Sequence, residues 1–416
     1  MFLRSVWTLA LAGAFASSPA VADAVSLTMS AAVDRAVAGS PALRAERAAM
    51  TAAEQQARLD GLKLPVTIGG EMENFAGTGN LSGIDDAEFT LRVGKTFELG
   101  GKREARQAIG ASRVALQGNE FERRRLDVVA QTKHRFLEVV AQQARLTLAE
   151  QESALARETR DAVAYRVKRG ASPEADLPLA ELVVARAELE QEDAGHELAS
   201  ARVALSVLWG ERSPSFTRAA GSVDTVPEVP AFETLTQRLE SNPDQQLFAL
   251  EAARLDAQRR SAEASRKPDL SGTLGVRRLE AFDDQALVMS IAMPIGLGQR
   301  SDLALSRGRA ELASLEGRRG AVELERYQEL FARYQELSHA RHEFETLRDR
   351  MIPAAESALA LARRGYDEAR YSFLQVAAAR NVLYSLQKDR IAAGTRYHRL
   401  LADIERATAV SGVTAP

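Results

Sequence analysis

Long helical segments dominate the pattern of hydrophobic and polar positions along the chain. From 102 to 168, apolar residues recur at spacings of three and four, and no proline or cluster of turn residues interrupts them. Ala, Glu, Arg and Gln fill the other positions, so the pattern predicts one helix about 100 Å long. A similar segment spans 300–365 with a predicted kink at Pro353, and shorter helices are predicted at 173–209 and 373–408. The narrow apolar stripe favours helices packed side by side, as in a coiled coil.

Four short segments instead alternate apolar and polar residues with a period of two, at 66–75, 87–97, 269–279 and 285–294. Each has about ten residues, the length of a tilted strand that crosses the hydrocarbon core of a membrane. Four strands cannot close a barrel, whose bacterial minimum is about eight, so a membrane location requires several copies of the chain. Two β-hairpins on a soluble helical protein are the alternative that periodicity alone leaves open.

The chain contains the same structural unit twice. Pro41 and Pro243 each open a helix, which is followed by two alternating segments, a basic turn and a long helical segment. Near the ends of the long segments, 165–169 parallels 366–370, with a turn just after each. A stretch rich in Pro, Ser, Val and Gly separates the halves. The predicted division is a signal peptide at 1–22, a first repeat at 23–212, a linker at 213–230, a second repeat at 231–411 and a tail at 412–416.

The first residues indicate secretion. Arg4 precedes an apolar run and a small-residue sequence that ends at Ala22, which is typical of a signal peptide. We expect cleavage after Ala22, with Ala24 as the second choice; a helix retained in the mature fold is the alternative. No later apolar stretch reaches about 18 residues, which excludes an α-helical membrane protein on hydropathy.

Composition removes several classes of function. The 416 residues include no cysteine, which excludes disulfides, thiolate metal ligands and a lipid-modified cysteine. The net charge of −3 gives no basis for a nucleic-acid partner. No catalytic arrangement of Ser, His and an acid and no phosphate-binding glycine loop stands out, so we predict no catalytic residue and no cofactor. His339 and His342 could share a helix face, but a solvated surface explains two histidines better than a metal site.

The sequence resembles the outer-membrane efflux protein family, the TolC-like outer-membrane factors. The resemblance rests on the duplication, on the helix starts at Pro41 and Pro243, and on the strand-to-helix turn Phe-Glu-Leu-Gly-Gly-Lys-Arg at 97–103. This turn is similar to the CzcC-like branch, which is paired with cobalt, zinc and cadmium efflux pumps. The resemblance implies a mainly α fold with a small β part: duplicated long helices form a coiled-coil barrel, and each chain adds four transmembrane strands to a barrel of about twelve in a homotrimer.

The same resemblance implies a place in the cell and partners. The strands would lie in outer-membrane lipid, and the helices would reach into the periplasm to meet a membrane-fusion adaptor and, through it, an RND-type inner-membrane pump. The residues expected to dock the adaptor are Arg169, Gly170, Ala171, Ser172, Arg370, Tyr371 and Ser372. The residues expected to form a periplasmic gate are Asp367, Glu368, Arg370, Glu174 and Asp176. Ordinary surface charges near a helix end are the alternative for this second set.

The sequence therefore predicts a passive duct and not an enzyme. Its expected role is the outer-membrane channel of a tripartite efflux system that exports heavy-metal cations. One alternative is a periplasmic coiled-coil adaptor or scaffold, which would carry a lipoyl-like or β-barrel domain beside one helical hairpin. The other is a duct of the same family for drugs or organic solutes.

Overall fold

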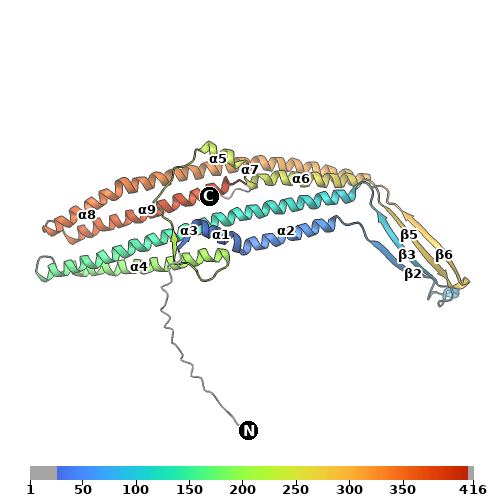
Figure 1. Ribbon diagram of the computed structural model, residues 1–416, viewed down its shortest axis with the longest axis horizontal. Coiled ribbons are helices and arrows are strands. Elements are labelled where there is room, and N and C mark those ends of the chain that lie inside the picture. Colours follow the sequence, from blue (N-terminus) through green and yellow to red (C-terminus); the bar gives the residue numbers. More distant parts are fainter. Residues whose placement is uncertain (1–25, 411–416) are drawn as a thin grey trace, which may run out of the picture.

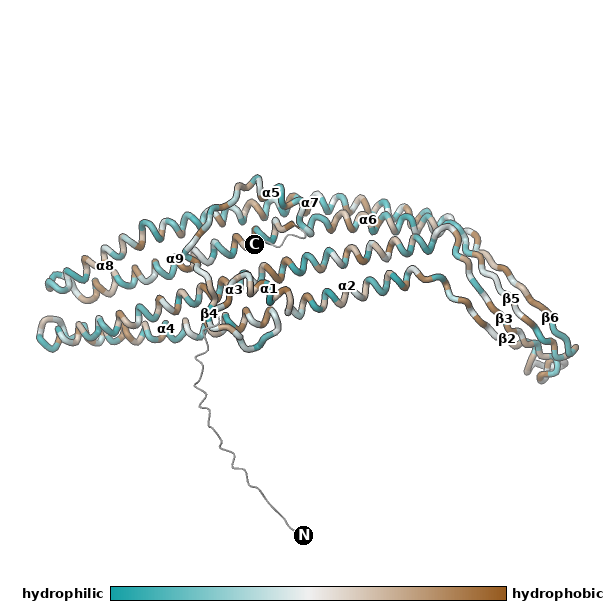
Figure 2. The backbone as a smooth tube through the Cα atoms, viewed as in Figure 1, coloured by the Kyte–Doolittle hydropathy of each residue, from teal (hydrophilic) through white to brown (hydrophobic). Residues whose placement is uncertain are grey.

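The computed structural model describes residues 26–410, so the predicted signal peptide with its cleavage position and the tail at 412–416 lie outside the described residues. The molecule is elongated: helices run side by side along most of its length, and the strands extend from one end at an angle to them (Figure 1). Apolar and polar residues are interspersed along the helices (Figure 2). No helix in the described part of the chain is long and apolar enough to cross a membrane.

Each half of the chain forms a helix, a β-hairpin, a long helix and a returning helix. The first long helix has the predicted bounds, because no proline occurs inside it. The elements of the first half are α2 (Pro41–Asp60), β2 (Val66–Glu73), β3 (Glu88–Phe97), α3 (Lys102–Lys168) and α4 (Asp176–Ser206). Those of the second half are α6 (Pro243–Ala264), β5 (Leu270–Leu279), β6 (Asp284–Ala292), α7 (Gly298–Thr346), α8 (Ile352–Asp367) and α9 (Phe373–Ala407).

The second long helical segment is interrupted where proline predicts it. A π-helical turn, Leu347–Met351, separates α7 from α8, and Pro353 lies in the first turn of α8. Proline has no N–H to donate and its ring crowds the preceding turn, so the wider π turn lets the helix continue past it. The prediction of a kink or repacked turn at Pro353 is confirmed.

The four strands form one antiparallel sheet in the order β2-β3-β5-β6. The register pairs Val66 with Lys95 across β2 and β3, and Lys95 with Gly272 across β3 and β5. Large apolar side chains remain uncovered on this sheet: Ile68 is 76% exposed and Leu287 is 79% exposed. Figure 1 shows the sheet projecting beyond the helices, so no helix among residues 26–410 covers it.

A compact region at mid-length joins the two halves. It adds β1 (Ser26–Thr28), α1 (Met29–Gly39), the short 3-10 turn Val207–Trp209, β4 (Arg218–Ala220) and α5 (Phe232–Leu239) to the elements above. The other two 3-10 turns, Gly79–Leu81 and Glu280–Phe282, lie in the loops of the two β-hairpins. β1 pairs in parallel with β4, which lies inside the predicted linker. Phe216 and Val223 of the linker are buried beside Phe136 of α3. The segment between the halves therefore connects them and also forms part of the core.

Candidate functional site at the helical tips

The two helical hairpins end in tips of the same backbone geometry. In the first tip Gly170 has φ of +67°, and its N–H donates to the carbonyl of Val167 at 2.9 Å. In the second tip Ala369 has φ of +59°, and its N–H donates to the carbonyl of Tyr366 at 3.0 Å. A left-handed residue after a helix is a common C-terminal cap, which alanine adopts at a steric cost. Tyr366 therefore corresponds to Val167 and not to Tyr165, so the predicted parallel between the tips is wrong in register by two residues.

Arg166, which the sequence did not single out, connects the two tips. Its guanidinium lies 4.4 Å from the centre of the Tyr366 ring, and its Nε donates to Ser172 Oγ at 3.3 Å. The hydroxyls of Ser172 and Tyr366 lie 3.0 Å apart, and Arg166 Nη1 is 3.8 Å from Asp367 Oδ1. Of the predicted site residues, Ser172 and Asp367 thus meet through an arginine in the last turn of α3.

A small apolar cluster lies directly behind these polar contacts. Val163 of α3, Ala180 of α4 and Phe373 of α9 are buried together, and Tyr366 packs against them. The tips are thus held together by this small cluster and a few polar contacts.

The other predicted docking residues are exposed. Arg169 lies over the Tyr165 ring at 4.4 Å, and Arg370 Nε lies 3.1 Å from Glu368 Oε2. Ser372 caps α9 in a capping box with Gln375. Gly170, Ala171 and Tyr371 complete the solvent-facing surface of the tips.

The candidate gate residues fall into two groups that the chain does not bring together. Asp367, Glu368 and Arg370 belong to the second tip, whereas Glu174 and Asp176 belong to the first. Glu174 is exposed, but Asp176 is buried in the first turn of α4. A buried carboxylate at the amino end of a helix has a structural role there, since it meets the positive end of the helix dipole.

Half-way between the tips and the centre, one ion pair joins α3 to α9. Arg380 Nε lies 2.5 Å from Glu152 Oε1, and its Nη2 donates to the Glu152 carbonyl at 2.8 Å. The Arg380 side chain is 5% exposed. Burial raises the pKa of Glu152, although Arg380 acts in the opposite direction.

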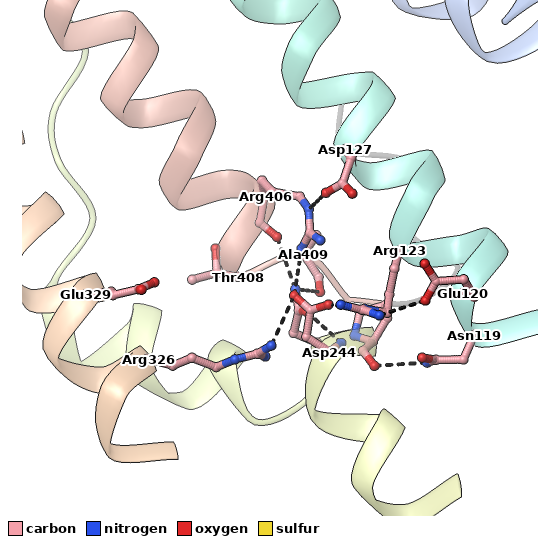
Figure 3. A network of polar contacts seen from close by, with 12 residues as sticks. Asn119, Glu120, Arg123, Asp127, Asp244, Arg326, Glu329, Arg406, Thr408 and Ala409 are labelled. Atoms are coloured by element: carbon pink, nitrogen blue, oxygen red, sulfur yellow. Dashed lines mark hydrogen bonds and ion pairs between the residues drawn. The ribbon is translucent and has the colours of Figure 1, made fainter. Parts of the chain in front are cut away.

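At the centre, Asp244 is the hub of a partly buried polar network that joins four helices (Figure 3). Its carboxylate lies 2.5 Å from Arg123 of α3, 3.0 Å from Arg406 of α9 and 3.5 Å from Arg326 of α7. Arg406 also binds Asp127 of α3 at 2.7 Å. We call these five residues the hub.

The backbone around the hub is equally well fixed. Asn242 accepts the N–H of Asp244 at 2.9 Å, which caps α6, and donates to the carbonyls of Arg406 and Ala409 at 3.1 Å each. Burial alone would raise the pKa of Asp244, but hydrogen bonds from Arg123 and Arg406 hold it below its ordinary value. The carboxylate therefore stays ionised at neutral pH, which keeps the hub assembled.

No group of three or more His, Asp or Glu residues in the described chain is arranged to hold a metal ion. His339 and His342 are both exposed on α7. A third histidine, His134, pairs with Asp403 at 2.8 Å.

Sequence similarity to known proteins identifies the family of this chain. The chain is 33% identical over 302 residues to the cobalt-zinc-cadmium resistance protein CzcC of Cupriavidus metallidurans, and the match covers 71% of each chain. Residues 32–211 also match the family model described as outer membrane efflux protein. The chain belongs to the outer membrane efflux protein family. The resemblance predicted from its turns and its duplication is confirmed.

Solved structures show that this efflux protein has the TolC-like fold. A membrane protein from Pseudomonas aeruginosa superimposes with a TM-score of 0.77 at 19% identity and covers 98% of this chain and 99% of its own. VceC of Vibrio cholerae gives 0.74 at 18% identity, with 92% and 96% covered. The open state of the MtrE outer membrane channel of Neisseria gonorrhoeae gives 0.74 at 17% identity, with 92% and 89% covered.

Membership in the family also settles the class of function. This efflux protein is an outer-membrane channel protein with a periplasmic helical part, and it is not an enzyme. The alternative of a periplasmic adaptor is wrong, because the channel fold accounts for nearly the whole chain.

Proposed function

We propose that three copies of this efflux protein close into one duct that exports heavy-metal cations of the cobalt, zinc and cadmium type. The duct would be the outer-membrane part of a tripartite system with a periplasmic adaptor and an RND-type inner-membrane pump. The observation that carries the proposal is a four-stranded sheet with uncovered apolar side chains and two free edges.

The free edges dictate how copies join. β2 and β6 each pair on one side only, and β2 runs away from the helices whereas β6 runs back toward them. The β6 edge of one copy can therefore pair in antiparallel fashion with the β2 edge of the next. Lipid supplies no hydrogen bonds to open edges, so the ring must close, and three copies give about twelve strands.

The helices next to these edges carry matching surfaces. α2 leads into β2, and its exposed face carries Ala45, Ala49, Ala52 and Leu59 at spacings typical of one helix face. When β6 joins the β2 of a neighbour, α7 comes to lie beside the neighbour's α2.

α7 presents a similar exposed stripe. Leu303, Ala310, Ala313, Gly317 and Leu324 follow one another at helical spacing along its open face. Alanine and glycine let two helices approach closely, and a leucine lies at the membrane end of each stripe. The same contact would therefore repeat in the strands and in the helices.

The tips would dock the adaptor and act as the closed end of the duct. Their exposed residues, Arg169, Gly170, Ala171, Arg370 and Tyr371, offer a surface at the end farthest from the sheet (Figure 1). Asp367, Glu368 and Glu174 would form rings of three like charges in a trimer, which repel unless a neighbouring chain supplies cations. We place the gate at these rings and at the Arg166 contacts.

Two measurements test the proposal. The mass of the detergent-solubilised protein should be that of three chains, and a monomer released from cells by osmotic shock would refute the duct. Deletion of the gene should sensitise cells to zinc, cadmium or cobalt, and re-expression should restore tolerance. Unchanged metal tolerance together with new sensitivity to organic drugs would show that the duct exports organic solutes and not metal cations. The proposal of a trimeric duct would then still stand.

A further inference from the structure

The two ends of the strands carry opposite charge. At the hairpin tips, 71–88 and 277–285 contain eight acidic residues and two basic ones. At the helix-proximal ends, 61–66, 95–106, 266–270 and 293–302 contain eight basic residues and four acidic ones. We call these four segments the junction. Its excess of positive charge contrasts with the net charge of −3 of the whole chain.

Most carboxylates of the junction are already paired within it. Asp269 Oδ1 lies 2.7 Å from Lys102 Nζ, and it also accepts the backbone N–H of Leu99 at 3.2 Å. Glu98 binds Arg106, and Asp302 binds Arg266. These pairs fix the turns between strands and helices and leave few anions for the remaining cations.

Four exposed cations of the junction have no carboxylate within 4.0 Å among the described residues: Lys63, Lys95, Lys267 and Arg300. The exposed carboxylate without an ion pair there, Glu104, lies in the first turn of α3, where it meets the positive end of the helix dipole. The unpaired charge of the junction is therefore clearly positive.

The fold places these four cations together at the helix-proximal end of the sheet. Lys63 and Lys267 precede the first residues of β2 and β5 by three positions, Lys95 is near the last residue of β3, and Arg300 lies in the first turn of α7. A side chain added at Gly100, which has φ of +81°, would come within 2.9 Å of Lys267 Cβ, so the turn and Lys267 are in close contact.

Uncovered apolar side chains lie at the same end of the sheet. Leu62, Phe97 and Ile295 are 60%, 50% and 87% exposed, and the Lys95 ammonium lies 5.5 Å from the centre of the Phe97 ring. Long cationic side chains beside apolar and aromatic groups are typical of a membrane interface, where the stems contact acyl chains and the charges reach the headgroups.

We propose that the junction binds the phosphates of anionic phospholipids at the periplasmic face of the membrane. The inference rests on the proposed duct, which puts the sheet in lipid and the junction at its periplasmic rim. A trimer would present the four cations three times around the rim, so the duct would prefer anionic over zwitterionic lipid and be held at a fixed depth.

The test uses the full-length, detergent-solubilised protein and two lipids, dioleoylphosphatidylglycerol and dioleoylphosphatidylcholine. The affinity of the intact assembly for each lipid is measured by native mass spectrometry. The wild type should prefer phosphatidylglycerol. The combined variant Lys63→Gln, Lys267→Gln and Arg300→Gln should bind it at least tenfold more weakly, because each cation near an anionic lipid contributes about fivefold in affinity. Its affinity for phosphatidylcholine should not change.

The matched control replaces Arg319, Arg350 and Arg364, which are exposed on α7, the π turn and α8, by Gln. It removes the same charge away from the junction and should keep the preference for phosphatidylglycerol. Equal affinity of wild type and junction variant, or an equal loss in the control, overturns the lipid proposal alone. Failure of the wild type to insert into vesicles of either lipid would refute the duct, and the lipid proposal with it.

Discussion

The hub and the tips hold the same helices together in different ways. At the hub the Asp244 side chain is 12% exposed and forms ion pairs with arginines from three helices. At the tips Arg166 makes longer contacts, and the Asp367 side chain beside it is 75% exposed. Charge pairs gain strength as they leave water, whereas exposed pairs contribute little. The helices are therefore held together strongly at the centre of the chain and only weakly at its periplasmic end.

This difference suits a duct that opens at one end. The hairpin α8–α9 can move away from α3–α4 at small cost near the tips, while the hub keeps their other ends in place. The Arg380 and Glu152 pair, which lies between the two regions, is more buried than the tip contacts. We expect the separation of the hairpins to stop there.

The largest effect should come from breaking the hub. Asp244→Asn leaves three partly buried arginines without their shared carboxylate and should lower the free energy of unfolding by about 3 kcal/mol. Urea unfolding followed by circular dichroism measures it. Asp302→Asn, which breaks an exposed pair with Arg266, should have a much smaller effect. Similar losses in both variants would contradict the contrast between buried and exposed pairs.

The contact of the linker with α9 should be the next most sensitive. A Cβ at Gly394 would overlap the carbonyl oxygen of Val223, so Gly394→Ala should cost about 1–3 kcal/mol of unfolding free energy. Gly195 in α4 has open space around it, and Gly195→Ala should instead stabilise by about 0.5–1 kcal/mol. Thermal midpoints of the two variants should therefore shift in opposite directions; a shift of both in one direction would show that the linker does not pack as described.

At the tips a change should alter opening more than stability. Tyr366→Phe removes the hydroxyl contact with Ser172 and should cost only about 1 kcal/mol, yet it should increase the time that the channel spends open in planar lipid bilayers. Tyr165→Phe is the control, because that exposed ring lies against Arg169 and makes no contact between the tips. Equal open times for the two variants would show that the Tyr366 hydroxyl has no role in the gate.

The smallest expected effect is that of mildly acidic pH on the stability that the hub contributes. The pKa of Asp244 is below its ordinary value in the folded chain, so its stabilisation is present above the unfolded pKa of about 3.9 and is lost as pH falls through the folded pKa. The difference in thermal midpoint between wild type and Asp244→Asn should stay constant from about pH 7.5 to about pH 5.5 and shrink below about pH 4. A difference that already shrinks near pH 6 would mean that burial outweighs the arginines and raises the pKa of Asp244 above its ordinary value.

Periodicity predicted the parts of the fold that repeat. The long helix α3 and the kink at Pro353 followed from spacing and from proline alone. The three-residue strands β1 and β4 are too short to show any period, and their pairing joins residues that lie far apart in the chain. Such pairing depends on the core around Phe136, which no local pattern reveals.

The candidate site was predicted in position but not in its contacts. Glycine and proline marked the first tip, whereas the left-handed residue of the second is Ala369, which no turn pattern indicates. Arg166 lies in an arginine-rich helix and is distinguished only by what faces it, Tyr366 and Ser172. Asp244 is an ordinary first-turn acid in the sequence, since its arginine partners lie far away along the chain.

In the proposed duct, copies of this chain join through α2 of one and α7 of the next. Because the chain has no cysteine, Leu59→Cys with Leu303→Cys places thiols only at the membrane end of those two faces. The control pair, Leu59→Cys with Leu361→Cys, places the second exposed thiol on α8 near the tips. After treatment with a short bis-maleimide, we expect covalent species up to the trimer for the first pair and none for the control. First-pair protein that stays monomeric under denaturing electrophoresis would contradict it.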